Sequence, residues 1–544
     1  MTTCGRFSRA TKRRAHNLFH LLGSARLAAS MCALVSLSIL CPAQDQSQYP
    51  VNEHYIVYHD VKVDANGGIL PWYSDDPSQA YDHDIRQVWN FWIHMRKCSD
   101  GVPVYLQHQV WTPVKDDPRG LGGDQINMAL DSWDLLYNYL GDPAVKDNMV
   151  FIADYWLNHG MSSPGSLWPN LPFPYNTDVE SGQIDGDMQN GKGFLQPDKA
   201  GSFGVELVML YKKTGNTRYL NAAIKIADTL ASKVTPGDAQ NSPWPFRVST
   251  DTGKVGQQEH DGKLYIASYT TNWSPTLQLF SDLEGLNKGR ADTYHHAASL
   301  VTAWLKKYPL VTNAWGPFFE DVSEYSDTEI NADTMAAYIL NHPAWEPNGQ
   351  AQALSILQWT EDRLGNHNFE KLQVVPINEQ TAYLVPGNSH TSRHASVELL
   401  YCERSGDNAR KQQAIRRLNW ATYSVDTDGK NRYPYDDVWL TDGYGDYVRH
   451  YLRAMASMPE LAPGDQNHLL RTSSVIQSIQ YSPETITYKK FDARSVEHIK
   501  LGSGTPSAIR GGTMQWDATS RVLTIDARST EVSVKLSSRQ VKGQ

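Results

Sequence analysis

Twelve helical segments joined by alternating short turns and long links are the feature of this 544-residue sequence that most constrains its fold. Apolar residues recur at helical spacing, and helix stop signals separate the segments. The predicted helices span 81–97, 124–140, 144–159, 198–214, 217–234, 270–287, 290–308, 329–341, 350–364, 391–405, 408–424 and 442–457. Because helices joined by a tight turn run antiparallel, this pattern predicts a series of helical hairpins.

The connections fall into two classes. The short ones are Gly141-Asp142-Pro143, Thr214-Gly215-Asn216, Leu286-Asn287-Lys288-Gly289, Ser405-Gly406-Asp407 and the longer turn 342–349. The long ones are 98–123, 160–197, 235–269, 309–328, 365–390 and 425–441, and they are rich in Gly, Pro, Trp, Tyr and Asn. Compact domains seldom keep links of this length unless the links carry function.

The first helix of each hairpin begins with small residues, such as Gly201 and Gly204, which let neighbouring helices approach closely. These helices start near 124, 198, 271, 331, 391 and 442, which indicates a degenerate six-fold repeat. The second helices carry one apolar stripe and one polar face, which is typical of an outer ring. Segment 81–97 is expected to pair with the last inner helix and to close the ring.

This arrangement, over about residues 80–460, resembles the (α/α)6 toroids of six-hairpin glycosidases and of toroid polysaccharide lyases. The stretch Trp244-Pro245-Phe246-Arg247, followed by Tyr269-Thr270-Thr271-Asn272, is also similar in layout to a pectate-lyase toroid family. No catalytic residue is transferred from that similarity. The resemblance implies a carbohydrate-active enzyme.

After Pro459 the helical periodicity ends. Five short alternating runs follow, SVIQSIQYS, TITYKKFDA, VEHIKLGS, RVLTIDA and EVSVKLSS, which predict a small β-sandwich. The expected fold class is therefore mainly α, an (α/α)6 toroid of six helical hairpins with a small C-terminal β-sandwich. The expected divisions are a signal peptide at 1–43, an N-terminal extension at 44–80, a toroid catalytic domain at 81–460 and a small β domain at 461–544.

The N-terminus has the pattern of a secretory signal peptide. Residues 1–26 carry six basic side chains and no acidic one, and residues 27–40 are apolar. With Cys41-Pro42-Ala43 as a small-residue site, cleavage after Ala43 is expected. Lipidation of Cys41 and a twin-arginine signal at Arg13-Arg14 are the alternatives. The expected location is secreted or periplasmic, with no membrane association after cleavage, because no later segment is long and apolar enough to span a bilayer.

Charge and cysteine content exclude some partners. Without residues 1–43 the chain keeps 44 basic and 59 acidic residues, a net charge of −15, which argues against nucleic acid as a partner. Cys98 and Cys402 then form either a disulfide or two buried thiols. No metal or cofactor is expected. Calcium at the acidic loops 185–190 and 426–431 is the alternative to simple turns, although neither loop has the full calcium-loop pattern.

The long links precede the inner helices, so the candidate site is expected at the N-terminal ends of those helices, where free N–H groups favour anions. Glycoside hydrolysis requires two carboxyl groups. The candidate catalytic acids at these starts are Asp124, Asp198, Asp442 and Asp446. Helix capping is the structural alternative for the first three.

Elimination from a uronate-containing glycan requires different groups, namely a proton-transferring side chain and groups that neutralise the carboxylate. Tyr269, His390 and His394 are the candidates for proton transfer. The candidates for binding the uronate are Arg247, His260, Asn272, Asn388 and Arg393.

Aromatic residues on the links are candidates for stacking on sugar rings, with core filling as the alternative. They are Trp168, Tyr175, Trp244, Trp315 and Trp439. The expected function is a glycoside hydrolase acting on a carbohydrate substrate. A polysaccharide lyase is the first alternative, and a non-catalytic glycan-binding protein is the second.

Overall fold

The computed structural model describes residues 55–56, 59–106, 123–178, 181–187, 189–260, 263–318, 326–433, 436–440, 445–502 and 504–537. The expected signal peptide, including Cys41, lies outside these residues. Within them, no helix is long and apolar enough to cross a membrane.

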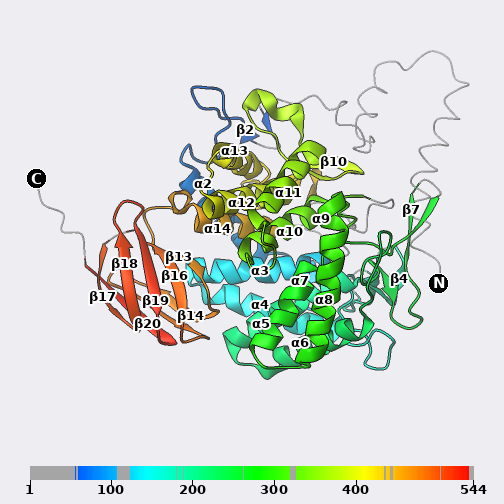
Figure 1. The fold of residues 1–544 in the computed structure, drawn as a ribbon. Coiled ribbons are helices and arrows are strands. Elements are labelled where there is room, and N and C mark those ends of the chain that lie inside the picture. The colour runs from blue at the N-terminus through cyan, green and yellow to red at the C-terminus, as the bar shows by residue number, and fades with distance from the viewer. Residues whose placement is uncertain are drawn as a thin grey trace, which may run out of the picture.

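Two rings of helices form the body of the molecule (Figure 1). The inner helices are α3 (Gly123–Leu140), α5 (Pro197–Thr214), α7 (Ser274–Gly285), α10 (Glu329–Asn341), α12 (Asn388–Ser405) and α14 (Asp446–Ser457). The outer helices are α2 (Pro77–Ile93), α4 (Pro143–His159), α6 (Thr217–Lys233), α8 (Ala291–Lys307), α11 (Gly349–Leu364) and α13 (Lys411–Thr422), and a short helix, α9 (Pro309–Thr312), follows α8. Each inner helix contacts the next, and α14 contacts α3, so the ring closes. The predicted toroid is confirmed.

Local sequence signals set the helix boundaries. The Asp142 side chain accepts a hydrogen bond from the Ala144 amide, and Pro143 occupies the first position of α4. Near the starts of the inner helices, small residues allow close packing against the neighbouring helix. A Cβ atom added at Gly201 or Gly204 would overlap Thr276 or Leu279 of α7, so these glycines let α5 lie against its neighbour.

Short strands lie in the N-terminal extension and in the long links. They are β1 (Tyr55–Ile56), β2 (His59–Asp60), β3 (Gly186–Asp187), β4 (Gly191–Lys192), β5 (Phe194–Leu195), β6 (Val248–Ser249), β7 (Gln257–His260), β8 (Lys263–Ile266), β9 (Asn378–Gln380), β10 (Tyr383–Pro386), β11 (Arg432–Tyr433) and β12 (Asp436–Leu440). β5 pairs with β6 across two different links, and a bridge joins Thr328 to Gln380 across two others. The links therefore share one face of the toroid.

The C-terminal residues form two four-stranded antiparallel sheets, in the strand orders β13-β16-β19-β18 and β14-β15-β20-β17. The strands are β13 (His468–Thr472), β14 (Ile476–Tyr481), β15 (Thr485–Lys490), β16 (Ser495–Lys500), β17 (Thr505–Arg510), β18 (Gly512–Asp517), β19 (Val522–Ala527) and β20 (Glu531–Ser537). The predicted β-sandwich is confirmed. The sequence pattern missed β13, β17 and β18, which all lie at sheet edges.

The sandwich packs against the short-turn end of the toroid (Figure 1). The Lys213 ammonium at the end of α5 donates to the Ile476 carbonyl at 2.7 Å. The ring of His468 stacks on Tyr139 at the end of α3, with centroids 3.8 Å apart. The sandwich and the long links thus lie at opposite ends of the ring.

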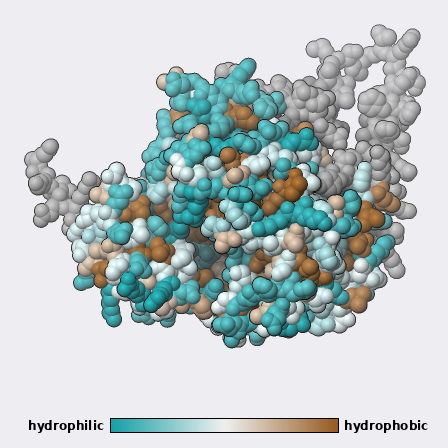
Figure 2. Space-filling model, in the orientation of Figure 1, coloured by the Kyte–Doolittle hydropathy of each residue, from teal (hydrophilic) through white to brown (hydrophobic). Residues whose placement is uncertain are grey.

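Cys98 and Cys402 are both buried and form no disulfide, so of the two alternatives the structure has the buried thiols. The surface seen in Figure 2 is largely hydrophilic, with small separate hydrophobic patches.

Replacing Gly406 with Ala should lower the free energy of unfolding by about 1–2 kcal/mol. Gly406 ends α12 with a left-handed φ of 77°, a conformation that strains any residue with a Cβ atom. Gly285→Ala at the end of α7 is the matched control, because that glycine has no positive φ and open space around its Cβ position. Urea denaturation of both variants measures the difference; equal stabilities would contradict the assignment.

Candidate active site

Polar side chains from the starts of the inner helices gather at the long-link end of the ring. They are Asp198 and Lys199 from α5, Asn272 just before α7, Glu329 from α10, His390 and Arg393 from α12, and Asp446 from α14. All seven residues are buried. Buried charges are costly unless they are paired, so their partners define what the group can do.

His390 lies between two carboxyl groups. Its Nδ1 is 3.3 Å from Glu329 Oε2, and its Nε2 is 3.7 Å from Glu379 Oε2 on β9. Burial alone would lower the pKa of His390, but the two carboxylates outweigh it and raise the pKa to about 9. Burial also raises the pKa of Glu329 to about 7, although Arg393 opposes this shift. This pair therefore retains a proton near neutral pH.

Arg393 links Glu329 to a second carboxylate. Its Nε is 3.4 Å from Glu329 Oε1, and its Nη2 donates to Asp446 Oδ2 at 2.7 Å. Burial would raise the pKa of Asp446, but Arg393, Arg449 and His450 outweigh it and hold the pKa well below its ordinary value. Two carboxyls beside one guanidinium thus have opposite shifts, a pattern typical of acid and base assignments in active sites.

A fourth carboxylate, that of Asp198, belongs to a separate group at the start of α5. The Lys199 ammonium lies 2.8 Å from Asp198 Oδ2, and the Asn272 amide donates to the same oxygen at 3.1 Å. Asp198 Oδ1 is buried and has no hydrogen-bond partner among the described residues. Gln196 occupies the cap position of α5, so Asp198 is not the helix cap.

His394 lies one helical turn after His390 but faces the outer helices. Its Nδ1 is 2.7 Å from Asp333 Oδ2, and its Nε2 is near Glu361 and Glu398. The side chains of Glu361, His394 and Glu398 lie close enough together to suit a metal ion. However, guanidinium groups occupy the carboxylates: Arg417 contacts Glu398 at 2.5 Å and Glu361 at 2.7 Å. The structure thus places His394 in a charge-balanced structural cluster.

The other predicted site residues that the structure describes lie in the core or between links. The Tyr269 hydroxyl donates to the Ala314 carbonyl at 2.7 Å, and the Asn388 amide donates to Asn431 at 3.1 Å. Arg247 is fully buried, with Nε 3.5 Å from Asp187. Asp187 Oδ1 accepts backbone hydrogen bonds from Gln189 and Asn190, as expected of a turn.

Four of the aromatic residues predicted to stack on sugars are buried, namely Trp168, Tyr175, Trp244 and Trp315. Trp244 packs on Trp273, and its indole N–H donates to the Leu230 carbonyl. Core filling is therefore what these side chains do, because their ring faces are covered by protein. The side chains of Asp124, His260 and Trp439, and Asp442 as a whole, lie outside the described part of the structure.

Glu329 and Glu379 were not among the predicted site residues. Glu329 stands at the first position of a predicted inner helix, the position that drew attention to Asp198 and Asp442. Applying the same rule to every inner helix start would have found it. Glu379 lies on a link with no such signal.

Comparison with known proteins supports the architecture. No protein-family model matches the sequence, and no curated protein is significantly similar to it. A cellobiose 2-epimerase from Spirochaeta thermophila DSM 6192 superimposes with a TM-score of 0.50 at 9% identity, covering 70% of this chain and 97% of the epimerase. The chain has the (α/α)6 toroid fold.

Two further structures are similar to the chain. A D-mannose isomerase gives a TM-score of 0.50 at 10% identity, with 70% of this chain and 99% of the isomerase covered. A GH76 α-mannanase from Bacteroides thetaiotaomicron gives 0.47 at 13% identity, with 70% and 98% covered. At these identities the likeness concerns the fold, and the chemistry has to be argued from the side chains.

Proposed function

We propose that this protein is a carbohydrate-active enzyme that cleaves glycosidic bonds by hydrolysis at the long-link end of its toroid. The observation that carries the proposal is the buried Glu329–His390 pair beside Arg393, which retains a proton near neutral pH. Glycoside hydrolysis needs a carboxylic acid that stays protonated until it protonates the leaving oxygen. Glu329 is the proposed proton donor.

The second carboxylate that hydrolysis requires is assigned to Asp198. Lys199 and Asn272 share its Oδ2, which leaves Oδ1 to accept a proton from an attacking water molecule or to attack the anomeric carbon of a sugar as a nucleophile. Asp446 is the weaker candidate for this role, because Arg393 and Arg449 both hold its carboxylate. Its proposed role is to fix Arg393 beside Glu329.

Elimination from a uronate remains the second candidate function. It is favoured by Arg393 and Lys199, two cationic groups of the kind that neutralise a uronate carboxylate. In that mechanism His390 would transfer a proton.

One screen separates these functions. The purified protein is incubated with neutral and uronic polysaccharides, and new reducing ends and ultraviolet absorbance of unsaturated uronates are followed together. Reducing ends without absorbance support hydrolysis, and both signals together support elimination. Conversion of a reducing sugar without bond cleavage, or binding without any turnover, contradicts the proposal.

The hydrolytic rate should fall as the pH rises through about 7. Glu329 must carry its proton to act as the donor, and its pKa is raised to about 7, so the active form is lost above that value. A profile of kcat/KM over about pH 5–9 measures this fall in rate. A rate that stays constant across neutral pH would exclude Glu329 as the acid.

We also propose that the enzyme acts outside the cytoplasm. The basic stretch 1–26, the apolar run 27–40 and Ala43 support export. N-terminal sequencing of exported protein should begin at or near Gln44. A lipid-modified Cys41 would instead indicate a lipoprotein.

A further inference from the structure

Arg247 stands directly before β6 and carries a fully buried guanidinium group. Within the part of the chain that the structure describes, none of its three side-chain nitrogens has a hydrogen-bond partner. Its Nε lies 3.5 Å from Asp187 Oδ2, which is close enough for an ion pair but too long for a good hydrogen bond. An arginine keeps its charge in proteins, and a buried charged group needs hydrogen bonds. The guanidinium therefore has N–H groups available for a ligand.

Asp187 does not need Arg247 for its own hydrogen bonds. Its Oδ1 accepts hydrogen bonds from the backbone amides of Gln189 and Asn190 and from the Asn190 side chain. Its Oδ2 accepts one from Gln196 Nε2 at 2.7 Å. Burial would raise the pKa of Asp187, but Arg247 and these hydrogen bonds outweigh it and lower the pKa. Asp187 thus balances the charge of Arg247 and leaves its N–H groups unused.

Unpartnered acceptors accompany these donors. Gln196 donates to Asp187 through its Nε2, but its buried Oε1 has no hydrogen-bond partner among the residues that the structure describes. Asp198, two residues further along, has a buried Oδ1 that likewise lacks a described partner. Buried polar atoms in proteins are nearly always hydrogen-bonded, so a group of unpartnered donors and acceptors points to a bound polar molecule.

The Phe246 ring connects Arg247 to the candidate active site. The Arg247 Cζ atom is 5.1 Å from the centroid of this ring, and the Lys199 ammonium is 5.4 Å from it. Lys199 in turn contacts Asp198, the carboxylate proposed to act on water or on the sugar. The unpartnered guanidinium is therefore about one aromatic ring away from the reacting group, a separation that suits the next sugar unit of a chain.

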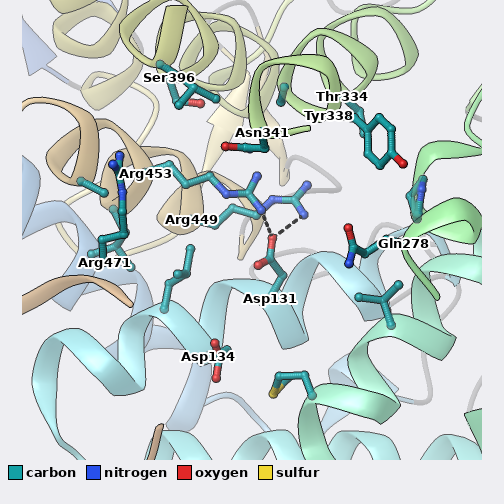
Figure 3. Close-up of a pocket in the computed structure, with 18 of the residues that line it drawn as sticks. Asp131, Asp134, Gln278, Thr334, Tyr338, Asn341, Ser396, Arg449, Arg453 and Arg471 are labelled. Carbon is teal, nitrogen blue, oxygen red and sulfur yellow. Dashed lines mark hydrogen bonds and ion pairs between the residues drawn. The ribbon is translucent and has the colours of Figure 1, made fainter. Parts of the chain in front are cut away.

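The charges of the adjoining space balance one another. A cavity of about 750 Å³ in the lumen shares Asn272 and Arg393 with the candidate active site, and equal numbers of acidic and basic side chains line it. In Figure 3, Asp131 contacts both Arg449 and Arg453 at the wall of this cavity. Because no charge is in surplus, the surroundings favour an uncharged ligand over a uronate.

We propose that Arg247 and Gln196 bind neighbouring hydroxyl groups of an uncharged sugar unit of the substrate, beside the unit that Asp198 contacts. A hydroxyl group can accept a hydrogen bond from the guanidinium, and a second one can donate to Gln196 Oε1. The identification of the ligand as a sugar rests on the proposed function. The sequence suggested Arg247 for the carboxylate of a uronate, but its pairing with Asp187 favours hydroxyl groups.

The links that cover Arg247 must part when a sugar binds, because the guanidinium is buried. A Cβ atom at Gly256 would lie 2.7 Å from Arg247 Cβ and 3.0 Å from Asn190 Oδ1, so the two links meet closely here. Asn190 Oδ1 also accepts a hydrogen bond from the Gln257 amide at 2.7 Å. This hydrogen bond lies at the surface, where water can replace it at little cost.

Calorimetric titration of the full mature protein tests the proposal, with Glu329→Gln present so that a bound sugar is not cleaved. The uncharged probes are cellotriose, mannotriose and galactotriose, and trigalacturonate is the charged comparison. At least one uncharged trisaccharide should bind more tightly than trigalacturonate. Arg247→Lys should weaken its binding by about tenfold to a hundredfold, because an ammonium cannot replace the forked guanidinium donors.

The choice of lysine separates binding from folding. Its ammonium keeps a positive charge opposite Asp187, so the midpoint of urea denaturation should stay near that of the parent protein. Arg290→Lys is the matched control, because Arg290 pairs with Asp228 on the outer wall and its side chain is 52% exposed. This control should leave both affinity and stability unchanged.

Analogues of the tightest trisaccharide that lack a single hydroxyl group identify the contact. One of them should bind about tenfold more weakly than its parent when Arg247 is present, and as tightly as its parent to Arg247→Lys. The variant already lacks the hydrogen bond that the analogue cannot form, so the two losses should not add. A merely structural role of Arg247 would weaken the parent and all analogues alike.

The proposal is overturned if no uncharged trisaccharide binds, if trigalacturonate binds most tightly, or if Arg247→Lys changes the affinity no more than Arg290→Lys does. If Arg247→Lys does not fold, Gln196→Met replaces it and should weaken binding by about threefold to tenfold, the effect of losing a hydrogen bond to an uncharged group. Gln196 makes no side-chain cap hydrogen bond to α5, so this change should leave the helix intact.

The outcomes of this test and of the cleavage screen can be told apart. Arg247-dependent binding without any cleavage would contradict the proposed hydrolysis and keep this sugar site. Cleavage by a protein whose sugar affinity does not depend on Arg247 would keep the hydrolysis and overturn the site.

Discussion

Glu329→Gln should lower kcat by about 10²–10⁴-fold, the range for removal of a general acid. The substitution preserves the size of the side chain and leaves an amide oxygen for His390, but it removes the proton that the leaving oxygen requires. Because the wild-type carboxyl is buried and its pKa is raised, the neutral amide should not destabilise the fold. Turnover of the substrate found in the screen tests the expected fall in kcat. The thermal unfolding midpoint tests the expected stability.

Glu370→Gln is the matched control for this prediction. Glu370 is 62% exposed, and its described partner is His367 on the same short helical turn. This variant should turn over substrate at the wild-type rate. A folded Glu329→Gln variant with nearly wild-type kcat would show that another group donates the proton, even if the toroid and its substrate are as proposed.

Arg417→Met should lower the free energy of unfolding by about 3–5 kcal/mol, the cost of leaving a buried charge without its partner. The buried Arg417 guanidinium contacts Glu398, Glu361 and the Val375 carbonyl. Methionine fills much of the same volume, so the loss of unfolding free energy reflects the charge cluster more than it reflects packing. Urea denaturation measures the change.

Arg528→Met serves as the control for Arg417→Met, because the Arg528–Asp526 pair is exposed and such pairs contribute little. Its stability should stay within about 0.5 kcal/mol of the wild type. The turnover per folded Arg417→Met molecule should be unchanged, since the cluster faces the outer helices. A stability loss below about 1 kcal/mol, or a selective loss of turnover, would contradict a purely structural role.

The helices could be predicted from the sequence because their signals are local. The apolar periodicity and turns such as Gly406 act within a few residues, so each predicted helix agrees with an observed one to within a few positions. The sequence pattern did not predict the edge strands β17 and β18, because little of their surface is buried. Their character depends on neighbouring strands that lie elsewhere in the sequence.

The site could be predicted only in part, because its groups meet across long sequence distances. His390 and Arg393 stood out because polar residues crowd one helix start, and the structure brings both to the same group. Their partner Glu329 is 61 residues away from His390, and only the closed ring reveals the contact. The prediction that aromatic residues of the links stack on sugars has a related weakness. Composition does not show which ring faces are covered by other parts of the protein.

The β-sandwich has a consequence for the way a polymer could meet this protein if the proposed function is correct. The sandwich packs against the short-turn end of the toroid, through contacts such as those of Lys213 and His468. A sugar chain that entered at the long-link end would therefore face the sandwich, and not open solvent, at the far end of the ring. Product would then leave through the end by which substrate arrived, which would set this architecture apart from tunnels that a polymer traverses from end to end.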